Sequence, residues 1–311
     1  MSTAVEPASA PASHIRRRSN GEDSLPPDYI LSEGYELRNL RASSSADSLP
    51  QYTAVYDDEA DASSSSASPY AGFYATKMLQ IQTMGHPLIA LPLPPRPEPI
   101  YVFGVEPTGE LDRAEYVSVR PARNSGSCFL ARADDPEQKP LCTTTYRFGP
   151  NRPPKIQLLG DDGAGENAEE ILFDGKGSFT RATTMRTPLG SFEWRYSTRA
   201  ERRAAGPDVD SLLILDRTTT VALEGGKQEV RRRKVGQLVR TGGLRTEGTR
   251  KSTAGNGGRL MLDLREWADR KGEAGQMELL AVASCVSMLK KEIDRRRFHQ
   301  TMVIMGAVSG G

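Results

Sequence analysis

An uncharged apolar segment late in the chain constrains the fold more than any other feature. Residues Met277–Leu289 read MELLAVASCVSML, and no charged side chain occurs from Leu279 to Leu289. A helix that is apolar on all sides must be surrounded by protein or lipid. These thirteen residues rise roughly 20 Å, whereas the hydrocarbon core of a bilayer is about 30 Å thick. The segment therefore predicts a buried core helix, expected at 276–298, rather than a membrane span.

Short segments rich in β-branched and aromatic residues fill most of the chain before this helix. We predict strands at Phe73–Thr83, Glu115–Pro121, Ser127–Ala133, Thr143–Phe148, Lys155–Leu159, Glu170–Phe173, Ser178–Met185, Gly190–Tyr196, Ser211–Asp216, Thr219–Leu223, Arg233–Val239 and Arg259–Leu264. Short strands at roughly 8–12-residue spacing are typical of a barrel or a sandwich. Helices and strands do not alternate, which disfavours an α/β fold. We expect a mainly β fold, an antiparallel barrel closed around the helix so that no sheet edge is exposed.

The pattern divides the chain into three parts. Residues 1–72 are poor in large apolar side chains and contain Ser tracts, so we expect a disordered, compositionally biased tail. Residues 73–300 form the predicted barrel, and residues 301–311 are expected to be a flexible end. The first 75 residues contain five Arg against eleven Asp or Glu, whereas residues 227–259 contain ten Lys or Arg against two Glu. This asymmetry predicts self-association or a partner site that the tail masks; the alternative is ordinary solvated charge.

Two motifs in the tail contain proline and tyrosine. Pro26-Pro27-Asp28-Tyr29 matches the PPxY ligand pattern of WW domains, and Leu49-Pro50-Gln51-Tyr52 resembles the looser LPxY form. Prolines pre-form an extended segment, so little entropy is lost when it docks in an aromatic groove. The motifs predict a WW-domain partner, although such short matches also arise by chance. The candidate contact residues are Pro26, Pro27, Tyr29, Leu49, Pro50 and Tyr52.

A proline-rich linker at Pro87–Pro99 separates the first predicted strand from the others. Its prolines exclude a helix and a central strand, so the linker should be extended. We expect it to pack across the barrel surface as an arm. Binding to an SH3-type partner is the alternative.

Two basic segments are candidates for anion binding. Arg231 and Arg233 share one face of a strand, because alternate side chains of a strand point the same way. The second segment is the Gly-rich stretch 243–258, whose surrounding basic residues are Arg245, Arg250, Lys251 and Arg259. That stretch lacks the GxxxxGK[ST] spacing of a phosphate-binding loop, so a flexible connection between strands is the alternative. Basic residues near an anionic bilayer contribute about 1 kcal/mol each, which favours a lipid head group. No aromatic residues are interleaved, which argues against nucleic acid.

Cofactor and catalytic signatures are not visible in the sequence. The three histidines are scattered, so we expect no metal site, and no pattern indicates a cofactor. Three cysteines without a CxxC pair are typical of a reduced intracellular protein. No signal-peptide pattern opens the sequence, so we expect a cytoplasmic protein. The absence of an acid–base or nucleophile constellation predicts a non-enzymatic function.

These features resemble a known superfamily. The β-rich region, the Thr187–Arg195 turn and strand (TPLGSFEWR) and an apolar C-terminal helix that ends in Lys and Arg resemble the tubby C-terminal-like superfamily. That superfamily includes tubby proteins, phospholipid scramblases, plant LURP-one-related proteins and fungal relatives. The resemblance covers about Phe73 to Phe298 and implies a barrel of twelve strands threaded by one hydrophobic helix. It transfers no functional residues, because no copy of the phosphoinositide-binding or calcium motifs of the family is recognisable.

The sequence supports two functional hypotheses. The first is a cytosolic adaptor whose tail motifs recruit a WW-domain protein such as a ubiquitin ligase. The second is a peripheral membrane protein whose basic barrel surface binds phosphoinositide head groups.

Overall fold

A computed structural model describes residues 72–93, 98–121, 126–146, 153–159, 170–176, 180–223 and 226–309 of the chain. The chain divides into two compact units, residues 1–64 and 65–311, and every described residue belongs to the second. The predicted tail therefore lies outside the described residues, apart from Gly72.

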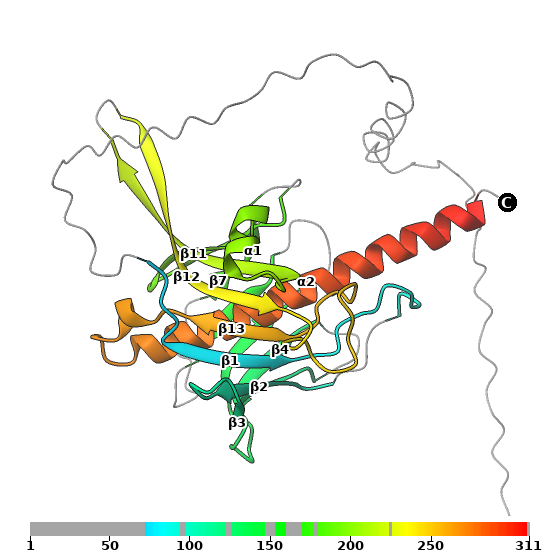
Figure 1. Ribbon diagram of the computed structural model, residues 1–311, viewed down its shortest axis with the longest axis horizontal. Helices are drawn as coiled ribbons and strands as arrows, with labels where there is room; N and C mark the ends of the chain where they lie inside the picture. Colours follow the sequence, from blue (N-terminus) through cyan, green and yellow to red (C-terminus); the bar gives the residue numbers. More distant parts are fainter. Residues whose placement is uncertain are drawn as a thin grey trace, which may run out of the picture. The chain divides into compact units, whose positions relative to one another are not determined.

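The described residues contain thirteen β-strands (Figure 1). The first seven are β1 (Lys77–Gln82), β2 (Ile100–Val105), β3 (Leu111–Val119), β4 (Cys128–Arg132), β5 (Pro140–Thr145), β6 (Lys155–Leu158) and β7 (Glu170–Leu172). The other six are β8 (Asp174–Gly175), β9 (Thr183–Thr187), β10 (Gly190–Tyr196), β11 (Ser211–Ala222), β12 (Gln228–Arg240) and β13 (Gly258–Leu262). The predicted mainly β fold is confirmed. The sequence pattern missed β2, because this strand directly follows the proline-rich linker.

All thirteen strands belong to one antiparallel sheet, in the order β7-β6-β5-β4-β3-β2-β1-β13-β12-β11-β10-β9-β8. Its two end strands, β7 and β8, are separated along the chain only by Phe173. Ile171 of β7 pairs with Ile156 of β6, and Gly175 of β8 pairs with Thr183 of β9. One short segment thus contains both end strands of the sheet, and it nearly closes the sheet into the predicted barrel. We call this segment, residues 170–175, the seam.

The long helix α2 (Glu273–Ser309) passes through the barrel, as Figure 1 shows. Every residue from Leu279 to Leu289 is buried, and Leu279 is the most exposed of them at 9%. The hydrophobic core joins α2 to residues from twelve of the thirteen strands, all except β8. The prediction of a core helix surrounded by strands is therefore confirmed.

Small side chains on α2 allow the strands to approach it closely. Ala281, Ser284 and Cys285 are fully buried. The indole Nε1 of Trp194 in β10 donates to Ser284 Oγ at 2.9 Å, and that hydroxyl donates to the Leu280 carbonyl at 2.6 Å. The buried polar groups of the helix and its strand neighbour are therefore paired, as burial requires.

α2 is longer than the sequence pattern predicts. The pattern places the helix at 276–298 and a flexible end at 301–311, whereas α2 begins at Glu273 and continues to Ser309. The predicted end is wrong because it was set at the basic cluster 295–297. No Gly or Pro follows that cluster before Gly306, so nothing in the sequence interrupts the helix there.

β11 and β12 form a long hairpin that extends beyond the barrel (Figure 1). The two strands predicted at 211–216 and 219–223 are one continuous strand, with a bulge between Leu215 and Asp216. The half of β11 before the bulge is buried, whereas its outer half is largely exposed. The hydrophobic pattern breaks at Arg217 because the buried run of β11 ends at Asp216 and the residues beyond it are partly or fully exposed.

Two short helices complete the described structure. The first, α1 (Arg199–Ala205), lies between β10 and β11 and buries none of its residues. The second is a 3-10 turn, η1 (Arg265–Trp267), which precedes α2 and buries Trp267. Neither was predicted, because α1 has no buried face that would give a hydrophobic periodicity and η1 is only three residues long.

Candidate functional site

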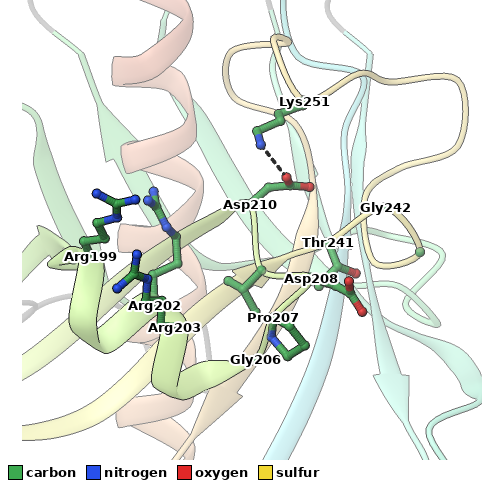
Figure 2. A pocket seen from close by; sticks show the side chains of 12 residues that line it. Arg199, Arg202, Arg203, Gly206, Pro207, Asp208, Asp210, Thr241, Gly242 and Lys251 are labelled. Carbon is green, nitrogen blue, oxygen red and sulfur yellow. Dashed lines mark ion pairs between the residues drawn. The ribbon is translucent and has the colours of Figure 1, made fainter.

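A groove of about 920 Å³ lies between α1 and the loop that follows β12 (Figure 2). Its lining residues are Arg199, Arg202, Arg203, Gly206, Pro207, Asp208, Val209, Asp210, Thr241, Gly242, Gly243 and Lys251. Four of these side chains are cationic and two are carboxylates, so the groove carries a formal excess of two positive charges. This charge balance favours an anionic ligand.

The first wall of the groove is α1, which is fixed to the barrel by its own capping residues. The Thr198 Oγ1 accepts from the Glu201 N–H at 3.2 Å, and the Glu201 carboxylate accepts from the Thr198 N–H at 2.7 Å. Arg195 of β10 donates to Glu201 at 2.7 and 2.9 Å and to Asp216 of β11 at 2.6 Å. The hydrogen bonds from Arg195 lower the pKa of Glu201 to about 2. Glu201 is therefore ionised at neutral pH and anchors α1 to two strands.

The three lining arginines of α1 are not used in this anchoring. Arg199 and Arg203 are exposed, and Arg202 is half-buried. Within the described part of the chain, none of the three side chains makes a hydrogen bond or an ion pair. Figure 2 places them on the α1 side of the groove, with Lys251 on the other side. Their guanidinium groups are therefore available to a ligand.

The second wall is the loop of residues 241–257. Asp210 accepts ion pairs from Arg245 and from Lys251, the latter at 2.8 Å (Figure 2). The Arg245 side chain is only 9% exposed, whereas that of Lys251 is 73% exposed. Arg245 therefore has a structural role, and Lys251 is the cation of this wall that a ligand can reach.

Glu292 of α2 fixes both walls at the point where α2 leaves the barrel. Its carboxylate accepts from Tyr196 Oη at 2.7 Å, from Arg240 at 3.0 and 3.2 Å, and from the Gly255 N–H at 2.9 Å. Tyr196 lies just before α1, Arg240 lies just before the loop, and Gly255 lies within the loop. Burial, and secondarily the charge of Glu292, raises the pKa of Tyr196 above its usual value, so its hydroxyl stays a donor.

The structure brings together only part of the predicted anion site. Arg245 and Lys251 meet at Asp210, but Arg231 and Arg233 lie on the outer part of the β11–β12 hairpin. Eight residues of extended chain, roughly 26 Å, separate Arg233 from Thr241 at the edge of the groove. Arg231 is 62% exposed and lies 3.3 Å from Glu229, and Arg233 pairs with Glu266. This part of the basic strand is therefore engaged in ion pairs with its own neighbours.

Arg250 and Arg259, the other two predicted residues, do not line the groove. Arg259 of β13 donates to Gln80 at 3.1 Å and to the Gly109 carbonyl at 3.2 Å, and burial lowers its pKa. Arg250 is exposed, and its backbone N–H donates to Thr253 Oγ1 at 3.1 Å. The six WW-motif residues, Pro26, Pro27, Tyr29, Leu49, Pro50 and Tyr52, lie outside the described residues.

The three arginines of α1 are not among the site residues predicted from the sequence. A signal for them exists in the capping-box pattern Thr198-Arg199-Ala200-Glu201, which predicts the start of a helix. The side chains at 199, 202 and 203 then fall on one side of a short helix, because residues three and four apart are neighbours.

Metal-binding clusters and reactive thiols are the other kinds of site that the described residues could form. Over the described ranges, no group of three or more His, Cys, Asp or Glu side chains could hold a metal ion. Burial raises the pKa of Cys128 and Cys142, and that of Cys285 to about 12. These thiols therefore stay protonated at neutral pH. Among the described residues, none of the helices combines the length and the hydropathy that a membrane-spanning helix requires.

No protein-family model, no curated protein and no solved structure matches the chain.

Proposed function

We propose that the protein is a non-enzymatic binding module whose barrel binds the phosphorylated head group of an anionic lipid in the groove. The observation that carries this proposal is the set of three α1 arginines without ion-pair partners among the described residues. Arginine presents a planar fork of donors that matches the oxygen geometry of phosphate. Three such forks opposite Lys251 suit a ligand with more than one phosphate group.

The second wall supports the same ligand class. Asp210 is the carboxylate closest to the cations of the loop, and its charge is already compensated by Arg245 and Lys251. An incoming phosphate would compete with Asp210 for Lys251, whose side chain is exposed. Each cation near an anionic surface contributes about 1 kcal/mol, so the groove would contribute a few kcal/mol to binding.

Vesicle binding by a double variant tests this proposal. Arg199→Gln with Arg203→Gln should weaken binding to vesicles that contain a phosphoinositide by at least about tenfold, because two cations are lost. Arg231→Gln with Lys139→Gln is the matched control, since it removes two exposed cations far from the groove. Unchanged binding of the groove variant to these vesicles would rule out the groove as the head-group site.

The tail motifs support a second function, an adaptor for a WW-domain protein such as a ubiquitin ligase. The observation that favours this function is the presence of two similar motifs, PPDY and LPQY, which end in Tyr29 and Tyr52. Tyr29→Ala with Tyr52→Ala should abolish capture by an isolated WW domain. Tyr35→Ala with Tyr56→Ala, in the same tail, should leave capture unchanged. Equal capture by both variants would contradict the adaptor function.

The resemblance to the tubby C-terminal-like superfamily is also a proposal. A barrel nearly closed around an apolar helix is the arrangement that this resemblance implies, and it supports membership. The described residues contain thirteen strands rather than twelve, because the seam counts as two short strands. A cytoplasmic location, with peripheral attachment to membranes, agrees with the proposed lipid ligand.

A further inference from the structure

The outer end of α2 is exposed and apolar. Phe298, Met302, Val303, Ile304 and Met305 are 62%, 44%, 73%, 44% and 63% exposed. From Met302 to Ala307 the helix carries no charged or hydrogen-bonding side chain on any face. A helix that is apolar all round is stable only when another phase or another protein covers it.

A second exposed apolar segment lies against this part of α2. It is the start of the predicted proline-rich arm, where Leu88, Ile89, Leu91 and Leu93 are 55%, 91%, 68% and 57% exposed. The sequence predicts that this arm crosses the barrel surface, whereas its described part is hydrogen-bonded to Arg297 and Gln300 of α2. We call the two segments together, residues 87–93 and 298–307, the apolar tip.

Hydrogen bonds hold the two segments of the apolar tip together. Gln300 Nε2 donates to the carbonyls of Pro87 at 3.3 Å and Leu88 at 2.9 Å, and Arg297 donates to the carbonyl of Pro92 at 3.4 Å. His86 Nε2 lies 2.7 Å from Gln300 Oε1. The two segments of the tip therefore form one continuous surface. With Met84 it holds ten of the sixteen large apolar side chains that are exposed in the described part of the chain.

Basic residues surround the base of the apolar tip. Arg295, Arg296 and Arg297 precede Phe298 directly, and Lys290 lies closer to the barrel, whereas the Lys291 amine contacts Phe173 at the seam. The nearest carboxylate on the helix, Asp294, pairs with Lys290 at 2.6 Å and more loosely with Arg297 at 3.7 Å. Residues 84–93 and 295–309 contain no Asp or Glu. A partner that is apolar inside and negatively charged at its surface complements both parts, and an anionic bilayer has this order of layers.

We propose that the apolar tip inserts into the surface of an anionic lipid membrane, with Arg295–Arg297 at the level of the lipid phosphates. Met302 to Ser309 spans roughly 12 Å of helix, which suits insertion into one interface but not passage through about 30 Å of hydrocarbon. This inference deepens the proposed function and rests on it only in taking a lipid surface as the ligand. Both walls of the groove are tied to Glu292, so groove and tip lie at the same end of the barrel.

Insertion is tested by fluorescence of the full-length chain with Val303→Trp. The two native tryptophans, Trp194 and Trp267, are buried, so a new exposed indole reports on the tip. We expect its emission to shift to shorter wavelength with vesicles of phosphatidylcholine and phosphatidylserine, and brominated acyl chains to quench it. Emission that does not change on vesicle addition would overturn the proposal.

A charge-insertion variant and its control test the same surface by flotation. Val303→Glu with Met305→Glu should lower the affinity for phosphatidylserine vesicles at least about tenfold, because the apolar area entering the interface is lost. Val230→Glu, at an apolar residue that is 53% exposed on the hairpin, should have no effect. Arg295→Gln should weaken binding about fivefold and reduce its salt dependence.

The outcomes separate the tip from the groove. If the groove variant loses the preference for phosphoinositide but still floats with phosphatidylserine, the proposed function and the inference both stand. If the tip variant floats as well as wild type, the inference fails and the groove can still stand. If wild type does not bind vesicles but forms dimers that the tip variant cannot form, the tip binds a second copy and the inference is overturned.

Discussion

Lys291 is a half-buried cation beside the seam of the barrel. Its Nζ lies 4.6 Å from the centre of the Phe173 ring and 3.3 Å from Thr183 Oγ1. Burial is the main cause that lowers its pKa from 10.5 to about 8. In the unfolded chain the amine keeps its ordinary pKa, so between pH 8 and 10.5 the unfolded state binds more protons than the folded state. Stability should therefore rise with pH above 8, and the penalty for burying the charge is fully present below 8.

Lys291→Met should remove this dependence. At pH 7 the variant should melt roughly 2–4 °C higher than wild type, and the difference should shrink as the pH approaches 9.5. The range stops there because Tyr116 and Tyr196 have raised pKa values, which make stability fall above pH 10. Lys139→Met, at an exposed lysine, is the control, and equal pH profiles for the two variants would contradict the assignment.

The Trp194–Ser284 hydrogen bond can be tested by single substitutions as well. Ser284→Ala leaves the buried indole N–H without its 2.9 Å acceptor, which should cost about 1–3 kcal/mol of unfolding free energy. In a Trp194→Phe background the same change should cost much less, because no donor remains unsatisfied. A double-mutant cycle by chemical denaturation measures the difference. Additive effects would mean that the bond does not couple the helix to β10.

The position of the loop 241–257 depends on its close approach to α2. Gly255 has φ +67°, and a Cβ there would lie 2.5 Å from the Leu289 carbonyl oxygen. Gly255→Ala should therefore both strain the backbone and push the loop away from Glu292. Gly248→Ala is a matched control, since φ is +77° and a Cβ would meet only Met84 at 3.6 Å. We expect the Gly248 variant to lose about 1–2 kcal/mol and the Gly255 variant clearly more.

The consequence for the groove can be measured separately from stability. If the loop is displaced, the Gly255 variant should also bind phosphoinositide vesicles more weakly, while the Gly248 variant should bind as wild type does. Equal stability and equal binding of the two variants would show that the contact with Leu289 is not required to position the loop.

The elements differ in how well the sequence predicts them. The core helix is predictable because eleven uncharged residues in a row can only be buried, and the strands are predictable where Gly and Pro separate them. The groove is not, because its walls meet through Glu292, which lies 96 residues from Tyr196 and 52 from Arg240. A single sequence carries no record of such pairings. Arg231 and Arg245 look alike in sequence, and only the folded chain shows that one lies on the hairpin and the other at Asp210.

Closure of the whole barrel depends on the seam. Phe173 is fully buried between β7 and β8, and its N–H donates to the Pro154 carbonyl at 2.9 Å. The strands on either side of it have only three and two residues, so few ladder hydrogen bonds hold the two ends of the sheet together. The buried ring must therefore supply much of the stability of closure.

Phe173→Ala should cost about 3–5 kcal/mol, the range for removing a large buried aromatic side chain. Because the loss is at the seam, amide hydrogen exchange should increase first in β6, β7, β8 and β9, while β1 and β13 on the opposite side of the sheet order stay protected. Leu172→Ala is the control next to it, since that side chain is 49% exposed and should change little. If exchange increases uniformly in all strands, the barrel unfolds as one unit and the seam is not its weakest line. A local increase at the seam would instead show that the sheet can open there while the rest of the barrel stays folded around α2.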